Sequence, residues 1–91
     1  MKRRDKPLPP ITAASTTLQQ LAPFIEKSGM TLLRLSNRAG LSRYTIYRWF
    51  RGQGKPSALE LEAMADIVDA EIIVVSKRTA GIVRKYAKEL Q

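Results

Sequence analysis

The feature that most constrains this chain is the stretch MTLLRLSNRAGLSRYTIYRWFRGQGKP, residues 30–56. Thr31 and Ser42 each precede a short amphipathic segment, where a hydroxyl can cap the first turn of a helix. Gly40 stands between the two segments and suits a turn that needs a positive φ. The stretch therefore predicts two short helices, 32–39 and 43–51, joined by a glycine-containing turn, which is the helix-turn-helix arrangement.

Charge and hydrophobicity divide the second of these helices into two faces. Ile46, Trp49 and Phe50 recur at helical spacing and predict a buried stripe. The opposite face combines basic and phenolic side chains, with Arg43 at its N-terminal end, followed by Tyr44, Tyr47, Arg48 and Arg51. The whole stretch 30–56 carries six Lys/Arg and no Asp or Glu, which favours entry into the DNA major groove.

Composition narrows the function further. The 91 residues allow one small domain, and a net charge of +8 favours a polyanionic partner. Because the chain contains neither cysteine nor histidine, disulfides and a zinc finger are excluded. The acidic residues near 60–69 have the spacing of a solvated helix face, so we expect no metal site there. We also expect neither a cofactor nor enzymatic activity. No apolar run reaches membrane-spanning length and no signal peptide is evident, which predicts a cytoplasmic, nucleoid-associated protein if the source is bacterial or phage.

The segments that flank the basic stretch complete a helical domain over 17–70. Residues 1–16 are basic and rich in proline, and we interpret them as a flexible arm. A first helix is expected at 17–28, with Pro23 either bending it or lying near its start. Ser57 and Glu60 form a capping box that opens a further helix, and the segment to about residue 70 has room for one helix or two.

Residues 71–91 have a different pattern, which predicts a strand and then an amphipathic helix over 79–90. The run 71–76 is β-branched, and its apolar members are Ile72, Ile73, Val74 and Val75. A lone strand cannot satisfy its own backbone hydrogen bonds, so we expect it to pair with the same strand of a second copy in a homodimer. The alternative is a buried extension of the preceding helix.

A spaced set of residues resembles the phage repressor and Cro (XRE-like) helix-turn-helix family. The set includes Ser36 where the two helices cross, Gly40 at the turn, and Ile46 and Trp49 on the second helix. Leu35, Leu41, Ser42, Gly52, Pro56, Ser57, Leu61, Met64 and Ala65 also match. The resemblance covers about 18–70 and implies an all-α, five-helix, lambda-repressor-like bundle. The strand after it is similar to one found in some antitoxin members.

The resemblance also implies which residues touch DNA. It makes 43–51 the recognition helix, and the expected base-contacting residues are Arg43, Tyr44, Tyr47 and Arg48. Leu32 stands where many members have a phosphate-contacting Gln, so we expect Leu32 to pack inward and the Thr31 hydroxyl or Arg34 to take over that contact. The expected phosphate-contacting residues are Thr31, Arg34, Arg38, Ser42, Thr45, Arg51 and Lys55.

These expectations combine into a sequence-specific regulator. A two-fold dimer would bind a palindromic operator with half-sites about 10 bp apart, most simply as a repressor. One alternative is an antitoxin that also binds a toxin or another protein partner. A second alternative is a nucleic-acid-binding module without sequence preference. A third is a module that binds a membrane surface through the basic final helix.

Overall fold

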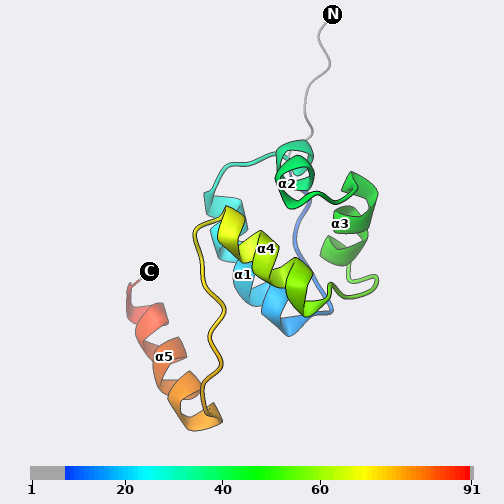
Figure 1. The fold of residues 1–91 in the computed structure, drawn as a ribbon. Helices are drawn as coiled ribbons and strands as arrows, with labels where there is room; N and C mark the ends of the chain where they lie inside the picture. The colour runs from blue at the N-terminus through cyan, green and yellow to red at the C-terminus, as the bar shows by residue number, and fades with distance from the viewer. Residues whose placement is uncertain (1–7, 91) are drawn as a thin grey trace, which may run out of the picture.

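The computed structural model describes residues 8–90, with side chains described for residues 8–86. Within this range the chain forms five α-helices and no strand (Figure 1). The helices are α1 (Thr16–Lys27), α2 (Leu32–Ala39), α3 (Arg43–Phe50), α4 (Ala58–Ile67) and α5 (Lys77–Leu90). The predicted helices at 17–28, 32–39 and 43–51 are confirmed to within a residue at each end.

Helices α1–α4 enclose one hydrophobic core. α2 packs against both α3 and α4, and α1 packs against α4. Each helix contributes the apolar stripe that its spacing predicts. The fully or nearly fully buried side chains are Leu18, Leu21, Ala22 and Ile25 of α1, Leu35 of α2, Ile46, Trp49 and Phe50 of α3, and Met64 and Ala65 of α4.

Side-chain caps set where each of these helices begins. The hydroxyls of Ser15, Thr31, Ser42 and Ser57 each accept a hydrogen bond from a backbone N–H in the first turn. Ser57 and Glu60 form the full capping box, because the Glu60 carboxylate also accepts from the Ser57 N–H at 2.7 Å. The caps at Thr31, Ser42 and Ser57 are therefore confirmed, whereas the sequence analysis did not identify Ser15.

Pro23 lies inside α1 rather than at its start. It has no N–H to donate to the carbonyl one turn earlier, which is that of Gln19. Pro23 itself is exposed, while its neighbours Ala22 and Ile25 are buried. The helix thus continues through the proline because the apolar face on either side of it is anchored in the core.

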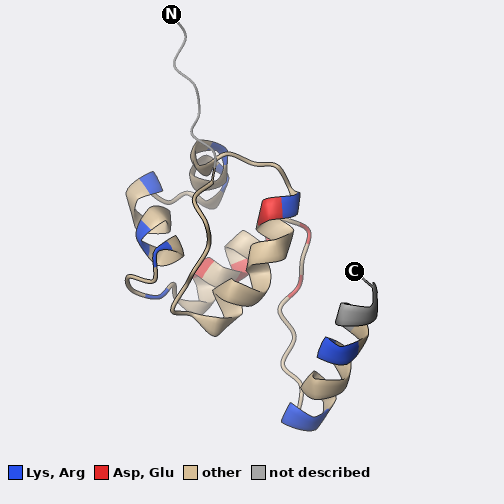
Figure 2. Cartoon of the chain, turned by 180° about the vertical axis from the view of Figure 1, so that it is seen from behind, with Lys and Arg blue, Asp and Glu red and all other residues tan. Residues whose placement is uncertain are grey.

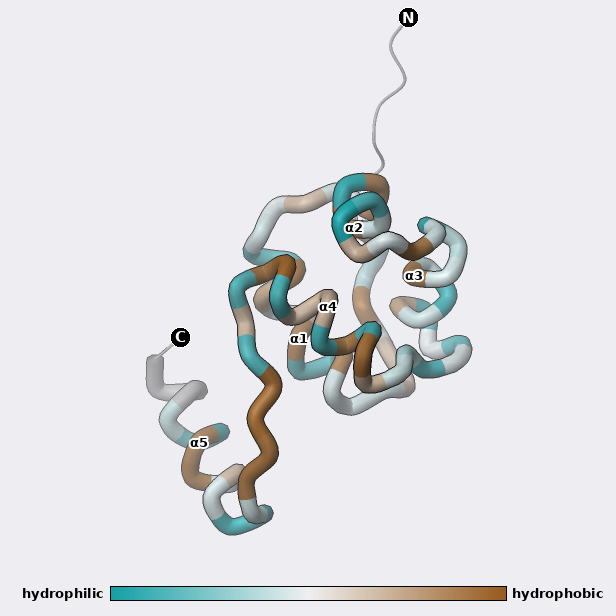
Figure 3. The backbone as a smooth tube through the Cα atoms, viewed as in Figure 1, coloured by the Kyte–Doolittle hydropathy of each residue, from teal (hydrophilic) through white to brown (hydrophobic). Residues whose placement is uncertain are grey.

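The predicted C-terminal strand is wrong. Residues 71–76 have no regular secondary structure, and Ile72, Ile73, Val74 and Val75 lie exposed along the linker between α4 and α5 (Figure 3). β-branched composition favours extended backbone, but a strand exists only where a neighbour supplies a hydrogen-bonding ladder. No segment within residues 8–90 supplies one. The linker ends at Ser76, whose hydroxyl caps α5 by accepting from the Thr79 N–H at 3.2 Å.

The expected five-helix bundle over 17–70 is also wrong. The segment that follows Ser57 forms one helix and not two, so α1–α4 make up this part of the chain. α4 ends when Asp69 adopts a left-handed φ of 58° and the Ala70 N–H turns back to the Ala65 carbonyl. The fifth helix, α5, lies apart from the other four (Figure 1). No packing contact between α5 and another helix is recorded for the part of the chain that the structure describes.

Within residues 8–90, no helix is both long enough and apolar enough to cross a membrane.

Candidate nucleic-acid interface

The turn between α2 and α3 holds the two helices at a fixed angle. Gly40 has a φ of 71°, a conformation that other residues rarely adopt. Its N–H and the Leu41 N–H both donate to the Ser36 carbonyl. Ser36 is a small residue that lies buried, 3% exposed, where the helices meet. Its hydroxyl donates to the Leu33 carbonyl at 2.8 Å, so this buried polar group has a hydrogen-bond partner.

The inner face of α3 is fixed by the core. Ile46 and Phe50 are completely buried and Trp49 nearly so. Since these three residues follow helical spacing, their burial forces the remaining face of α3 outward. The core thereby holds α3 in place with its basic face exposed to solvent.

A segment before α1 anchors the C-terminal end of α3. Ile11 is buried, and the Thr12 N–H and hydroxyl both donate to the Phe50 carbonyl, at 2.8 and 3.2 Å. Gly52 follows with a φ of 83°, and a Cβ placed there would lie 3.0 Å from the Thr12 carbonyl oxygen. The sequence pattern places residues 8–15 in the N-terminal arm, and it contains no signal of this contact. Residues 1–7, the rest of that arm, lie outside the described residues.

Two stacked pairs occupy the outer face of α3. The Arg48 guanidinium lies 5.8 Å from the centroid of the Tyr44 ring, and that of Arg51 lies 5.6 Å from the Tyr47 ring. Arg51 also donates to the Tyr47 hydroxyl at 2.7 Å. Both pairs are four residues apart and exposed, so each arginine is oriented by its tyrosine while its remaining N–H groups face solvent.

The N-terminal end of α3 presents Arg43, Ser42 and Thr45. Arg43 is exposed beside the first turn. The Ser42 hydroxyl accepts from the Thr45 N–H at 3.0 Å and shares a hydrogen bond of 2.8 Å with the Thr45 hydroxyl. These hydroxyls lie beside the positive end of the helix dipole, an environment that suits a phosphate oxygen.

The other predicted contact residues lie on α2 and the loop after α3. Arg34 and Arg38 are exposed on α2, and Lys55 is exposed in the loop. Thr31 is half-buried at the start of α2, where its hydroxyl accepts from the Arg34 N–H at 3.2 Å. Leu32 packs against the core, which confirms that it faces inward.

Charge is unevenly distributed over the helical bundle. Lys and Arg mark α2, α3 and the loop that follows, and also α5, while most of the described Asp and Glu lie on α4 and the linker (Figure 2). The turn brings the basic residues of α2, α3 and the loop together, which concentrates positive potential on this surface. Such a surface attracts phosphates, and its exposed arginines can also read base edges.

The described residues contain no cluster of three or more His, Cys, Asp or Glu that could hold a metal ion. Two exposed hollows are recorded on the described surface. One is lined by Leu8, Pro9, Pro10, Glu26, Gly29, Met30 and Thr31, and the other lies along α4. Neither adjoins the outer face of α3.

The model of a helix-turn-helix family, of the XRE type, matches residues 24–75, which is more than half of the chain. The chain belongs to this helix-turn-helix family. The family consists of DNA-binding transcription regulators that are typically not enzymes, and this helix-turn-helix protein is accordingly a DNA-binding regulator. Neither a curated protein nor a solved structure matches the chain.

Proposed function

We propose that this helix-turn-helix protein is a sequence-specific repressor that binds a palindromic operator as a homodimer, with α3 in the major groove. The observation that carries the proposal is the outer face of α3. There, the Arg48 guanidinium is oriented by the Tyr44 ring one turn away, on a helix whose opposite face is buried. A side chain held in position loses less entropy on binding than a free one, which favours base-specific contact.

The residues divide by what each side chain can reach. Arg43 and Arg48 can bind guanine O6 and N7 in bidentate fashion, while Tyr44 and Tyr47 can contact a thymine methyl or a phosphate. A second set positions the protein without reading sequence, because phosphate oxygens are the same at every base pair. This set comprises Thr31, Arg34, Arg38, Ser42, Thr45, Arg51 and Lys55.

Repression is the simplest form of regulation for a small DNA-binding unit that acts as a dimer. The described residues form one compact DNA-binding unit and a single further helix, and a dimer of such units covers two half-sites about one helical turn apart, or about 10 bp. A protein bound across a promoter excludes polymerase by occupancy alone. No further domain is required for that effect.

The test is a binding selection on random genomic fragments at about 150 mM salt, with excess competitor DNA, because affinity for DNA depends steeply on salt. The expected result is recovery of one inverted repeat with half-sites about 10 bp apart. Placing that repeat over a reporter promoter should then lower expression when the protein is present.

Two other results would contradict the proposal. Uniform weak recovery of all fragments would mean that the basic surface binds nucleic acid without sequence preference. Recovery of an isolated half-site, without a repeat, would retain sequence-specific DNA binding but remove the palindrome and the dimer.

A further inference from the structure

Helix α5 has an apolar face that nothing covers. Ile82, Val83 and Tyr86 lie at helical spacing on one side, and each is more than half exposed. No other helix packs against α5 within the described part of the chain. An isolated helix of this length is only marginally stable in water, so its apolar face requires a partner.

The outer face of α4 is a second unpartnered surface, and it is partly apolar. Leu59 is 78% exposed, the most of any large apolar residue of α1–α4. Helical spacing aligns Leu59, Glu62, Ala63 and Asp66 on one strip, and these residues line a shallow hollow along α4. Ile72 of the linker closes one end of the same hollow.

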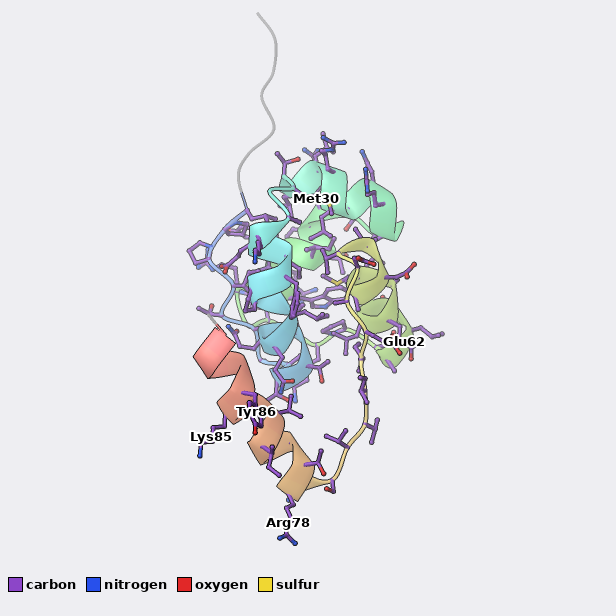
Figure 4. All side chains as sticks on the ribbon, turned by 90° about the vertical axis from the view of Figure 1, so that its left-hand side faces the viewer. Met30, Glu62, Arg78, Lys85 and Tyr86 are labelled. Atoms are coloured by element: carbon purple, nitrogen blue, oxygen red, sulfur yellow. The ribbon has the colours of Figure 1, made fainter. Side chains whose placement is uncertain are left out.

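The two surfaces have opposite charge. The described side chains of α5 include Lys77, Arg78, Arg84 and Lys85 and no acidic residue. The α4 hollow is edged by Glu62, Asp66 and Glu71. No ion pair within residues 8–86 joins these groups, and Figure 4 shows Arg78 and Lys85 pointing away from the helical bundle and from Glu62.

We propose that α5 of one chain packs into the α4 hollow of a second copy, and that the second copy returns the same contact. Ile82, Val83 and Tyr86 would then cover Leu59 and Ala63, while Arg78 and Lys85, the basic residues that flank this face at helical spacing, would approach Glu62 and Asp66. Each chain supplies both halves of the contact, so two copies close the arrangement around a two-fold axis. The inference rests on the homodimer of the proposed function and specifies its interface, which uses helix packing and no β-ladder.

The second copy is favoured over the chain's own α5 because of how the linker runs. Residues 71–76 lead from the end of α4 to α5 without regular structure, and they carry α5 away from its own bundle (Figure 1). Ile72 of the same linker already lies at the edge of the hollow. Exchange of a terminal element between identical chains is a common route to a dimer.

Charge reversal with mixing of chains tests the interface. One variant carries Glu62→Lys and Asp66→Lys, and the other carries Arg78→Glu and Lys85→Glu. Each variant alone places like charges against each other in its homodimer, which should raise the dimer dissociation constant by about tenfold or more. Mixed together, the two variants restore opposite charges in both contacts and should form a heterodimer. The measurement is sedimentation velocity at micromolar concentration without DNA, with one variant fluorescently labelled.

Controls separate this interface from a general effect of charge. Glu26→Lys with Lys27→Glu reverses two exposed charges on α1 that line neither surface, and it should leave the dimer intact. Ile82→Asp should give a monomer without altering α4 at all. Thermal melting of every variant reports whether α1–α4 remain folded.

Several outcomes would overturn the inference. These are a wild-type chain that is monomeric at tens of micromolar, reversed variants that remain dimeric, or a mixture that stays monomeric. Docking of α5 on its own α4 would give the last of these, since heterodimers could not form. Because no DNA is present, a failed interface is distinguishable from a failed proposed function, which only the fragment selection measures.

Discussion

At the residue scale, several side chains with which we propose that α3 contacts DNA already have restricted freedom. Arg48 and Arg51 are stacked on the tyrosines one turn before them, and Arg51 also donates to the Tyr47 hydroxyl. The sequence indicated these residues by helical spacing and charge. It could not indicate the pairing, because four-residue spacing permits contact between two side chains but does not decide which rotamers they adopt.

The first prediction concerns base readout by Arg48. Arg48→Ala should weaken binding to the selected operator by about 1–3 kcal/mol, or roughly 5- to 150-fold, because a bidentate guanine contact is lost. Thermal stability should not change, since Arg48 is exposed. Fluorescence anisotropy at fixed salt measures the affinity. Lys27→Ala is the control because Lys27 is an exposed basic residue of α1, and an equal loss in both variants would remove Arg48 from the recognition set.

The second prediction concerns the anchor of α3 at Gly52. Gly52 and Gly29 both have positive φ, so an alanine at either position should cost about 1–2 kcal/mol of folding free energy. Only at Gly52 does the added Cβ approach another atom, the Thr12 carbonyl oxygen at 3.0 Å, while at Gly29 it meets open space. Gly52→Ala should therefore destabilise more than Gly29→Ala in urea unfolding. Equal losses would mean that the Thr12 segment does not hold α3.

At the scale of elements, helix boundaries were predictable from the sequence, but the conformation of residues 71–76 was not. Caps such as Ser42 and Ser57 act on their own first turn, so local sequence contains the information that starts a helix. A strand depends on a partner that local sequence does not name. The Thr12 contact with Phe50 spans 38 positions along the chain, and neither residue signals the other. For the same reason the α5 face was recognised as amphipathic while its lack of a neighbour was not.

The third prediction belongs to α1. Pro23 is exposed inside a helix where it removes one backbone hydrogen bond, so Pro23→Ala should stabilise the protein, by up to about 3 kcal/mol. The rigidity that proline gives to the unfolded chain offsets part of this gain. Urea unfolding monitored by circular dichroism at 222 nm, the standard helix signal, measures the change. Gln20→Ala, at an exposed site of the same helix, should shift stability by much less, and a destabilised Pro23→Ala variant would contradict the argument.

At the scale of the whole molecule, α2, α3, the loop after them and α5 are basic, and most of the described acidic residues lie on α4 and the linker (Figure 2). The net charge and the acid-free stretch 30–56 were visible in the sequence. The separation of the α4 acids from the basic residues of α2 and α3 was not, because it depends on how α4 packs against α2. Three segments contribute to the basic side, and only the fold brings them together.

The fourth prediction uses this surface to count phosphate contacts. Lys55→Ala should weaken binding about equally for operator and unrelated DNA, because a phosphate contact carries no sequence information. The slope of log affinity against log salt should become less negative by about 1 for each half-site bound. Arg48→Ala should instead change the ratio of specific to unspecific binding. If Lys55→Ala altered that ratio and left the slope unchanged, Lys55 would not be a phosphate contact.

The segregation of charge also has a kinetic consequence. The field of a polyanion attracts the basic surface of α2 and α3 and the basic helix α5, and it repels the acidic α4, so the molecule turns α4 away before contact is made. Fewer collisions would then be wasted on the α4 side. The association rate constant should accordingly fall with added salt more steeply than net charge alone would require, because dissolved ions screen the orienting field within about 10 Å.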